Sequence, residues 1–106
     1  MSENNSQSME IIMQLIMHGG DAKSSAMEAI QAAKKGDFSL AEDKLEHSQE
    51  AINEGHRVQT ELLSKEAEGN EMDLNLLMVH AQDQLMSAMT YRDLAMEIIE
   101  IYNRID

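Results

Sequence analysis

Apolar side chains recur every three or four residues along three segments of the chain, which is the spacing of α-helices with one buried face. The pattern predicts helices over about residues 9–35, 38–66 and 72–105. Residues 2–8 are polar and lack this period, so we expect a disordered N-terminal tail over residues 1–8. The breaks between segments are short enough to require antiparallel neighbours. The expected fold is therefore all-α, a single antiparallel three-helix bundle over residues 9–106.

Turn-forming residues support both breaks. Gly36 follows two lysines and suits the left-handed position after a helix, and Asp37 suits the first cap of the next one. The second break spans residues 68–71, with Asp73 as a plausible cap for the third helix. These signals predict two reversals of the chain.

Two adjacent glycines, Gly19 and Gly20, interrupt the first segment. Glycine inside a helix costs about 1 kcal/mol relative to alanine. The pair therefore predicts either a bend or the close approach of another backbone, and we favour close helix packing.

The third segment is apolar on nearly all sides. On a helical wheel it carries two stripes, and one of them must find a partner outside a three-helix monomer. We therefore expect an obligate oligomer in which one stripe packs within the subunit and the other against further copies. The first stripe consists of Leu76, Val79, Met86, Leu94, Ile98, Ile101 and Ile105, and the second of Leu74, Met78, Ala81, Leu85, Ala88, Met96 and Ile99.

Composition and charge narrow the classes of function. The formal charge of −12 would be repelled by nucleic acid and by anionic membrane surfaces. No apolar run approaches the roughly 20 residues of a membrane span, and no signal peptide precedes the first helix, so we expect a cytoplasmic protein. The chain lacks cysteine, zinc-site spacings, a phosphate-binding glycine loop and a nucleophilic serine motif. Nucleotide cofactors and hydrolase chemistry are therefore not expected.

A polar group lies within or beside the first stripe, where a subunit interface is expected. It contains His80, Asp83, Ser87 and Tyr91. A lone histidine on an apolar face is more often a satisfied core residue than a ligand or catalyst. Asp83 raises a sharper question, because carboxylates gathered at a rotation axis would share protons or bind a divalent cation through hard oxygen ligands.

The remaining histidines and the methionines carry weaker signals. We expect His47 to be a surface residue and His56 to be packed and hydrogen-bonded, while His18 flanks the glycine pair. The ten methionines are expected mainly as core fillers. Those expected on the surface are Met13, Met17, Met27 and Met89.

Three runs resemble one known family. They are AAKKGDFSLAEDKL at 32–45, NEGHRVQTELL at 53–63 and LLMVHAQDQLMSAM at 76–89. They are similar to the lactose/cellobiose (chitobiose) class of enzyme IIA of the bacterial sugar phosphotransferase system, and the likeness extends from Met9 to Arg104. The resemblance implies a homotrimer of three-helix subunits, a nine-helix bundle. It also implies a phosphotransferase component that accepts a phosphoryl group from HPr and passes it to a cysteine of the cognate enzyme IIB during disaccharide uptake.

The same resemblance implies roles for individual residues. His80 matches the phosphoryl acceptor, reacting through its tele nitrogen Nε2, and Asp83 matches the aspartate that binds a divalent cation, commonly Mg²⁺, on the threefold axis. Gln84 stands where a second histidine often follows that aspartate, so a second supporting imidazole is not expected. Gln82, Ser87 and Tyr91 are the first donors to examine as support, and Gln84 is a further neutral donor.

An alternative reading needs no chemistry. A non-catalytic helical scaffold or adaptor with a structural metal site would use His80 and Asp83 only to organise its oligomer. Phosphorylation of His80 separates this alternative from the carrier function.

Overall fold

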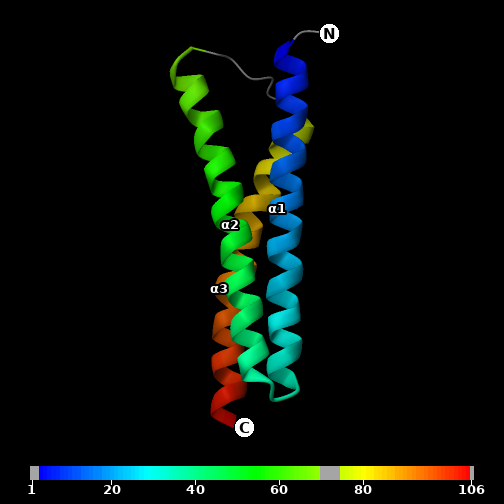
Figure 1. Cartoon of the computed structure of the whole chain (residues 1–106), viewed down its shortest axis with the longest axis vertical. Coiled ribbons are helices and arrows are strands. Elements are labelled where there is room, and N and C mark those ends of the chain that lie inside the picture. Colours follow the sequence, from blue (N-terminus) through cyan, green and yellow to red (C-terminus); the bar gives the residue numbers. More distant parts are fainter. Residues whose placement is uncertain (1–2, 70–74, 106) are drawn as a thin grey trace.

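Three long α-helices make up the computed structural model, which describes residues 3–69 and 75–105, with side chains described from Met9 onward (Figure 1). Helix α1 spans Glu3–Lys34, α2 spans Phe38–Ala67 and α3 spans Leu76–Ile105. The described part of the chain contains no strand. The two ends of the chain lie at opposite ends of the molecule, as expected for three helices running down, up and down. The predicted all-α three-helix bundle is confirmed.

The helix ends differ from the prediction at two places. Helix α1 begins at Glu3 instead of Met9, which corrects the prediction that residues 3–8 belong to a tail. Those residues include no glycine or proline, and extending an existing helix is far easier than nucleating one. Helix α3 is capped by Asn75, whose Oδ1 accepts from the Met78 amide at 2.9 Å. The expected start at residue 72 and the expected cap Asp73 lie outside the described residues.

The first reversal follows the predicted chemistry. Gly36 has a φ of 82°, the left-handed conformation that glycine adopts without strain. Asp37 caps α2 by accepting a hydrogen bond from the Leu40 amide at 3.1 Å. The two residues therefore end one helix and start the next within a few positions.

Helix α1 packs along both other helices, whereas α2 and α3 contact each other less. Small residues line much of its inner face, including Ala22, Ala26 and Ala29, which are fully buried. Near the middle of α2, buried Ser48 donates its hydroxyl to the Ala22 carbonyl at 2.7 Å. The result is a thin rod 56 Å long and 22 by 19 Å across, held together on α1 as its central element.

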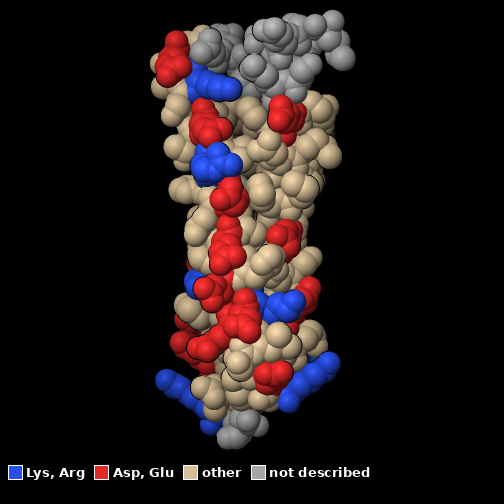
Figure 2. Space-filling view, in the orientation of Figure 1, with Lys and Arg blue, Asp and Glu red and all other residues tan. Residues whose placement is uncertain are grey.

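Acidic side chains gather along one side of the rod. Figure 2 shows a red column running along much of its length, in the line of α2. The exposed acids of that helix include Glu42, Asp43, Glu46, Glu50, Glu54 and Glu61. No helix in residues 3–69 or 75–105 is long and apolar enough to cross a membrane.

Candidate functional site

The fold buries one of the two apolar stripes of α3. Ala81, Leu85 and Ala88 of the second stripe are fully buried against α1 and α2, with Met78 and Ile99 nearly so. The first stripe is left open, with exposed fractions between 51% and 83% at Leu76, Val79, Met86, Leu94, Ile101 and Ile105. The predicted division of α3 into a face packed within the subunit and an apolar face without a partner in the single chain is therefore present.

His80 and Asp83 lie on this open side of α3, one turn apart. Both side chains are exposed in the single chain. His80 is therefore not a core histidine of the subunit, and its imidazole is accessible to another molecule. Among the described residues, no three His, Asp or Glu side chains converge to hold a metal ion.

Gln82 is turned toward α2. Its Oε1 accepts a hydrogen bond from Gln59 Nε2 at 2.7 Å, and its own amide lies 3.9 Å from the Met78 sulfur. The Gln59 amide also lies 3.9 Å from the Met86 sulfur. Gln82 thus joins α3 to α2 on a different side of the helix from His80, with its carboxamide oxygen already occupied.

Gln84 and Tyr91 are linked through α1. Lys23 donates to Gln84 Oε1, and its Nζ lies 5.2 Å from the centre of the Tyr91 ring. Ser87 donates its hydroxyl to the Gln84 carbonyl at 3.3 Å, within its own helix. The fold therefore brings Gln84, Ser87 and Tyr91 together on the side of α3 that meets α1.

Lys23 and Gln59 were not among the predicted site residues. Each lies on a different helix from His80, and its partner is 61 or 23 positions away along the chain. In the sequence, Lys23 stands out only as a cation four residues after Gly19, close to the inner face of α1. Its contact with Gln84 can be identified only once the rotation of α1 against α3 is known.

Gly19 is a point of close contact between α1 and the backbone of α3. A Cβ added there would lie 2.9 Å from the carbonyl carbon and oxygen of Gln84, closer than real Cβ atoms approach. A Cβ added at Gly20 would meet nothing within 4 Å in the chain. The close packing predicted for the glycine pair is confirmed, and it belongs to Gly19 alone.

The two glycines should respond oppositely to alanine. Gly19→Ala should lower the free energy of unfolding by up to about 2 kcal/mol, because a backbone clash of about 1–3 kcal/mol outweighs a helix-propensity gain of about 1 kcal/mol. Gly20→Ala should raise it by about 1 kcal/mol through propensity alone. Urea unfolding followed by helical circular dichroism, at equal protein concentrations, measures both. Equal or higher stability of Gly19→Ala than of the unmodified chain would contradict the close approach.

The other histidines have different surroundings. His47 is exposed, as predicted, and its Nε2 lies 3.2 Å from Asp21 Oδ2. His56 is exposed, so the prediction of a packed histidine is wrong. The buried face of α2 runs through Gly55 and Val58, and His56 therefore points away from the core. His18 is half-buried, and a Cβ added at Gly55 would lie 3.3 Å from the His18 Cβ.

Three of the four methionines expected on the surface are exposed, namely Met13, Met17 and Met27. Met89 is half-buried and packs against the alanine-rich middle of the core, which corrects that prediction. The physical reason is the thin centre of the bundle, where alanines leave room for a longer side chain from α3.

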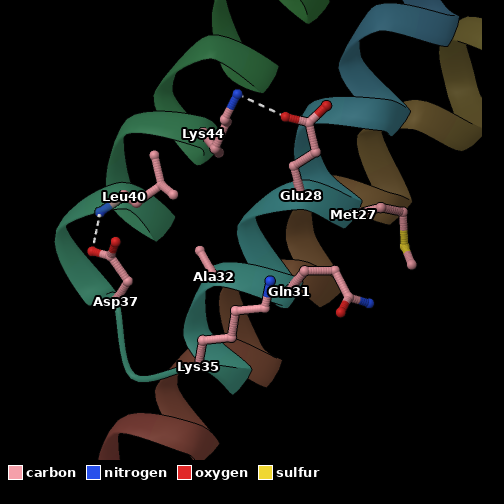
Figure 3. Close-up of a pocket in the computed structure, with 8 residues that line it drawn as sticks. All are labelled: Met27, Glu28, Gln31, Ala32, Lys35, Asp37, Leu40 and Lys44. Atoms are coloured by element: carbon pink, nitrogen blue, oxygen red, sulfur yellow. Dashed lines mark hydrogen bonds and ion pairs between the residues drawn. The ribbon is translucent and has the colours of Figure 1, made fainter.

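A separate hollow of about 490 Å³ lies at the reversal between α1 and α2 (Figure 3). Gln31, Lys35 and Leu40 line part of it, and the Lys44–Glu28 ion pair of 2.7 Å crosses between the helices. It contains none of the predicted site residues. The chemistry of α3 is therefore on an open helix face and does not depend on this hollow.

Comparison with known proteins places this arrangement in a family. Residues 10–103 match the family model described as "PTS system, Lactose/Cellobiose specific IIA subunit". The chain is 52% identical to the lichenan-specific phosphotransferase enzyme IIA component of Bacillus subtilis over 101 residues, covering 95% of this chain and 92% of that protein.

Solved structures agree over nearly the whole length. The crystal structure of the cellobiose-specific enzyme IIA from Bacillus anthracis superposes with a TM-score of 0.92 at 42% identity, covering 99% of this chain and 93% of that one. The IIA(chitobiose) chain in the solution structures of the Escherichia coli IIA(chitobiose)–HPr complex gives 0.81 at 40% identity, covering 92% and 95%. The chain belongs to the lactose/cellobiose-specific IIA subunit family and is a component of the sugar phosphotransferase system.

Proposed function

We propose that this chain accepts a phosphoryl group from HPr on Nε2 of His80 and passes it to a cysteine of its cognate enzyme IIB. The pathway would support uptake of a disaccharide of the cellobiose, chitobiose or lactose type, with the exchange taking place in the cytoplasm. The observation that carries the proposal is an exposed imidazole on α3, one turn from the positioned amide of Gln84, in a chain of the IIA family. The structure of a relative with HPr supports the choice of donor.

The chemistry requires little from the protein. A lone pair on His80 Nε2 forms the new N–P bond while the N–P bond of phospho-HPr breaks, and the electron pair of that bond stays with the HPr nitrogen. Each imidazole keeps the proton on its other nitrogen, so this step requires no proton transfer. In the second step the IIB thiolate attacks phosphorus and His80 leaves. Access to His80 is therefore essential, and its exposure provides it.

We also propose that three copies assemble through the first stripe of α3. The open apolar surface continues onto α1, because Met27 and Ile30 line a groove with Tyr91, Leu94 and Ile98. Six large apolar side chains more than half exposed on one helix face form a continuous surface of the kind that a second copy covers. His80 and Asp83 flank this surface and would lie at the boundary between subunits.

Within that assembly Asp83 would bind a divalent cation, in our proposal Mg²⁺. A carboxylate provides the hard oxygen ligand that Mg²⁺ prefers, and its place on the first-stripe side of α3 would let three copies converge. The cation would offset the repulsion between the gathered carboxylates.

Magnesium should then stabilise the protein. Saturation at about 100 times the dissociation constant adds roughly 2.7 kcal/mol of stability, so the melting temperature should rise by several degrees. Asp83→Asn should remove this response, whereas Asp93→Asn, at an exposed aspartate of the same helix, should keep it. A magnesium response that survives in Asp83→Asn would show that the cation binds elsewhere.

The carrier function is tested with the unmodified chain. Incubated with phosphoenolpyruvate, enzyme I and HPr, it should gain the mass of one phosphoryl group, and fragmentation should place that group on the peptide containing His80. Adding the cognate IIB should remove it. No gain in mass would overturn the proposal and leave the scaffold alternative.

A further inference from the structure

Lys23 of α1 points its charge at the site on α3. Its half-buried side chain donates to Gln84 Oε1 and lies 5.2 Å from the centre of the Tyr91 ring. A cation at this distance from an aromatic ring is attracted by its face. One ammonium group therefore ties together two α3 residues that lie about two helical turns apart.

The backbone contact at Gly19 brings Lys23 within reach. Gly19 packs directly on the Gln84 backbone, and Lys23 follows it by four residues on the same side of α1. The lysine thus extends from a fixed point of the helix pair. Its position is set by this close contact between α1 and α3.

This contact determines which way the Gln84 carboxamide faces. An ammonium group has three donors and no acceptor, so it must meet the oxygen of the amide. The Gln84 NH₂ group is then turned away from Lys23 and keeps both of its donors for another partner. Without the lysine, the amide would be free to flip.

Gln84 follows His80 by four residues, so the two side chains lie on one face of α3, about 5–6 Å apart at Cβ. We propose that Lys23 is a positioning residue that holds the Gln84 amide so that its NH₂ donates to an oxygen of the phosphoryl group on His80. The proposal rests on the proposed function, and it adds a residue from α1 to the reaction on α3.

The positioned Gln84 amide would also stabilise the negative charge on the phosphoryl oxygens. Transfer leaves negative charge on the three equatorial oxygens throughout, while the N–P bond to HPr breaks and the N–P bond to His80 forms. A fixed donor stabilises that charge without reorganising, which is where such groups have their largest effect. Lys23 would therefore change the rate of transfer more than the binding of HPr.

The test compares Lys23→Met with the unmodified chain in single-turnover transfer from phospho-HPr. The maximal rate should fall roughly tenfold or more, because loss of one oriented donor costs about a hundredfold to a thousandfold and Lys23 acts only by orienting that donor. The HPr concentration that gives the half-maximal rate should change by less than about twofold. Lys23→Arg, which also only donates, should recover much of the rate. Lys44→Met, which removes an ion pair with Glu28 on the far side of α1, is the matched control and should transfer normally.

Action through Gln84 predicts non-additivity. Gln84→Met should slow transfer about as much as Lys23→Met, and the double variant should be no slower than either. Melting curves identify any variant that fails to fold, in which case Lys23→Ala replaces Lys23→Met. A change in half-maximal HPr concentration alone, or multiplicative losses in the double variant, would overturn the positioning role. A normal rate in Lys23→Met overturns this inference alone, whereas an unmodified chain that gains no phosphoryl group overturns the proposed function as well.

Discussion

His80→Ala is expected to gain no phosphoryl group from phospho-HPr while keeping the helicity and assembly of the unmodified chain. Removing the nucleophile removes the covalent intermediate, so the transfer rate should fall by at least about a thousandfold. The imidazole is exposed, so its loss leaves no cavity and should change stability by less than about 0.5 kcal/mol. Intact mass and circular dichroism, measured on one preparation, give both results.

His56→Ala is the matched control, because this histidine is also exposed on a long helix. It should accept a phosphoryl group at the normal rate. His80→Gln keeps a polar side chain without the nucleophilic ring nitrogen and should be as inactive as His80→Ala. A phosphoryl gain that persists in both His80 variants would assign the carrier role to another residue.

Ile101→Glu should break the assembly. Ile101 belongs to the first stripe and is 58% exposed in the single chain, and in the proposed trimer another copy covers it. A glutamate placed there in each copy would put unpaired charges into an apolar interface, at a cost of several kcal/mol for each charge. Sedimentation velocity at micromolar concentration should change from a trimer to a monomer.

Leu63→Glu provides the control, since Leu63 is also 58% exposed but lies on α2, away from the first stripe. It should remain trimeric. A monomeric unmodified chain at micromolar concentration would overturn the proposed trimer, and a trimer that survives Ile101→Glu would move the interface to another face of the molecule.

Local signals predicted much of the fold. Helix period and caps depend on residues within a turn or two of each other, so Gly36 and Asp37 could be assigned from neighbouring residues alone. The start of α1 was missed because polar residues without an apolar period still extend a helix already formed. His56 was placed wrongly because a small rotation of α2 decides which edge residue turns inward.

The sequence by itself determined the three helices, the two-sided character of α3 and the place of His80 and Asp83 on it, because these follow from the 3.6-residue period. Only the tertiary structure decided that Gly19 seats α1 on the Gln84 backbone, and that Lys23 and Gln59 reach Gln84 and Gln82 from other helices. Such contacts depend on the rotation and spacing of packed helices, which are set by how side chains of distant segments fit together.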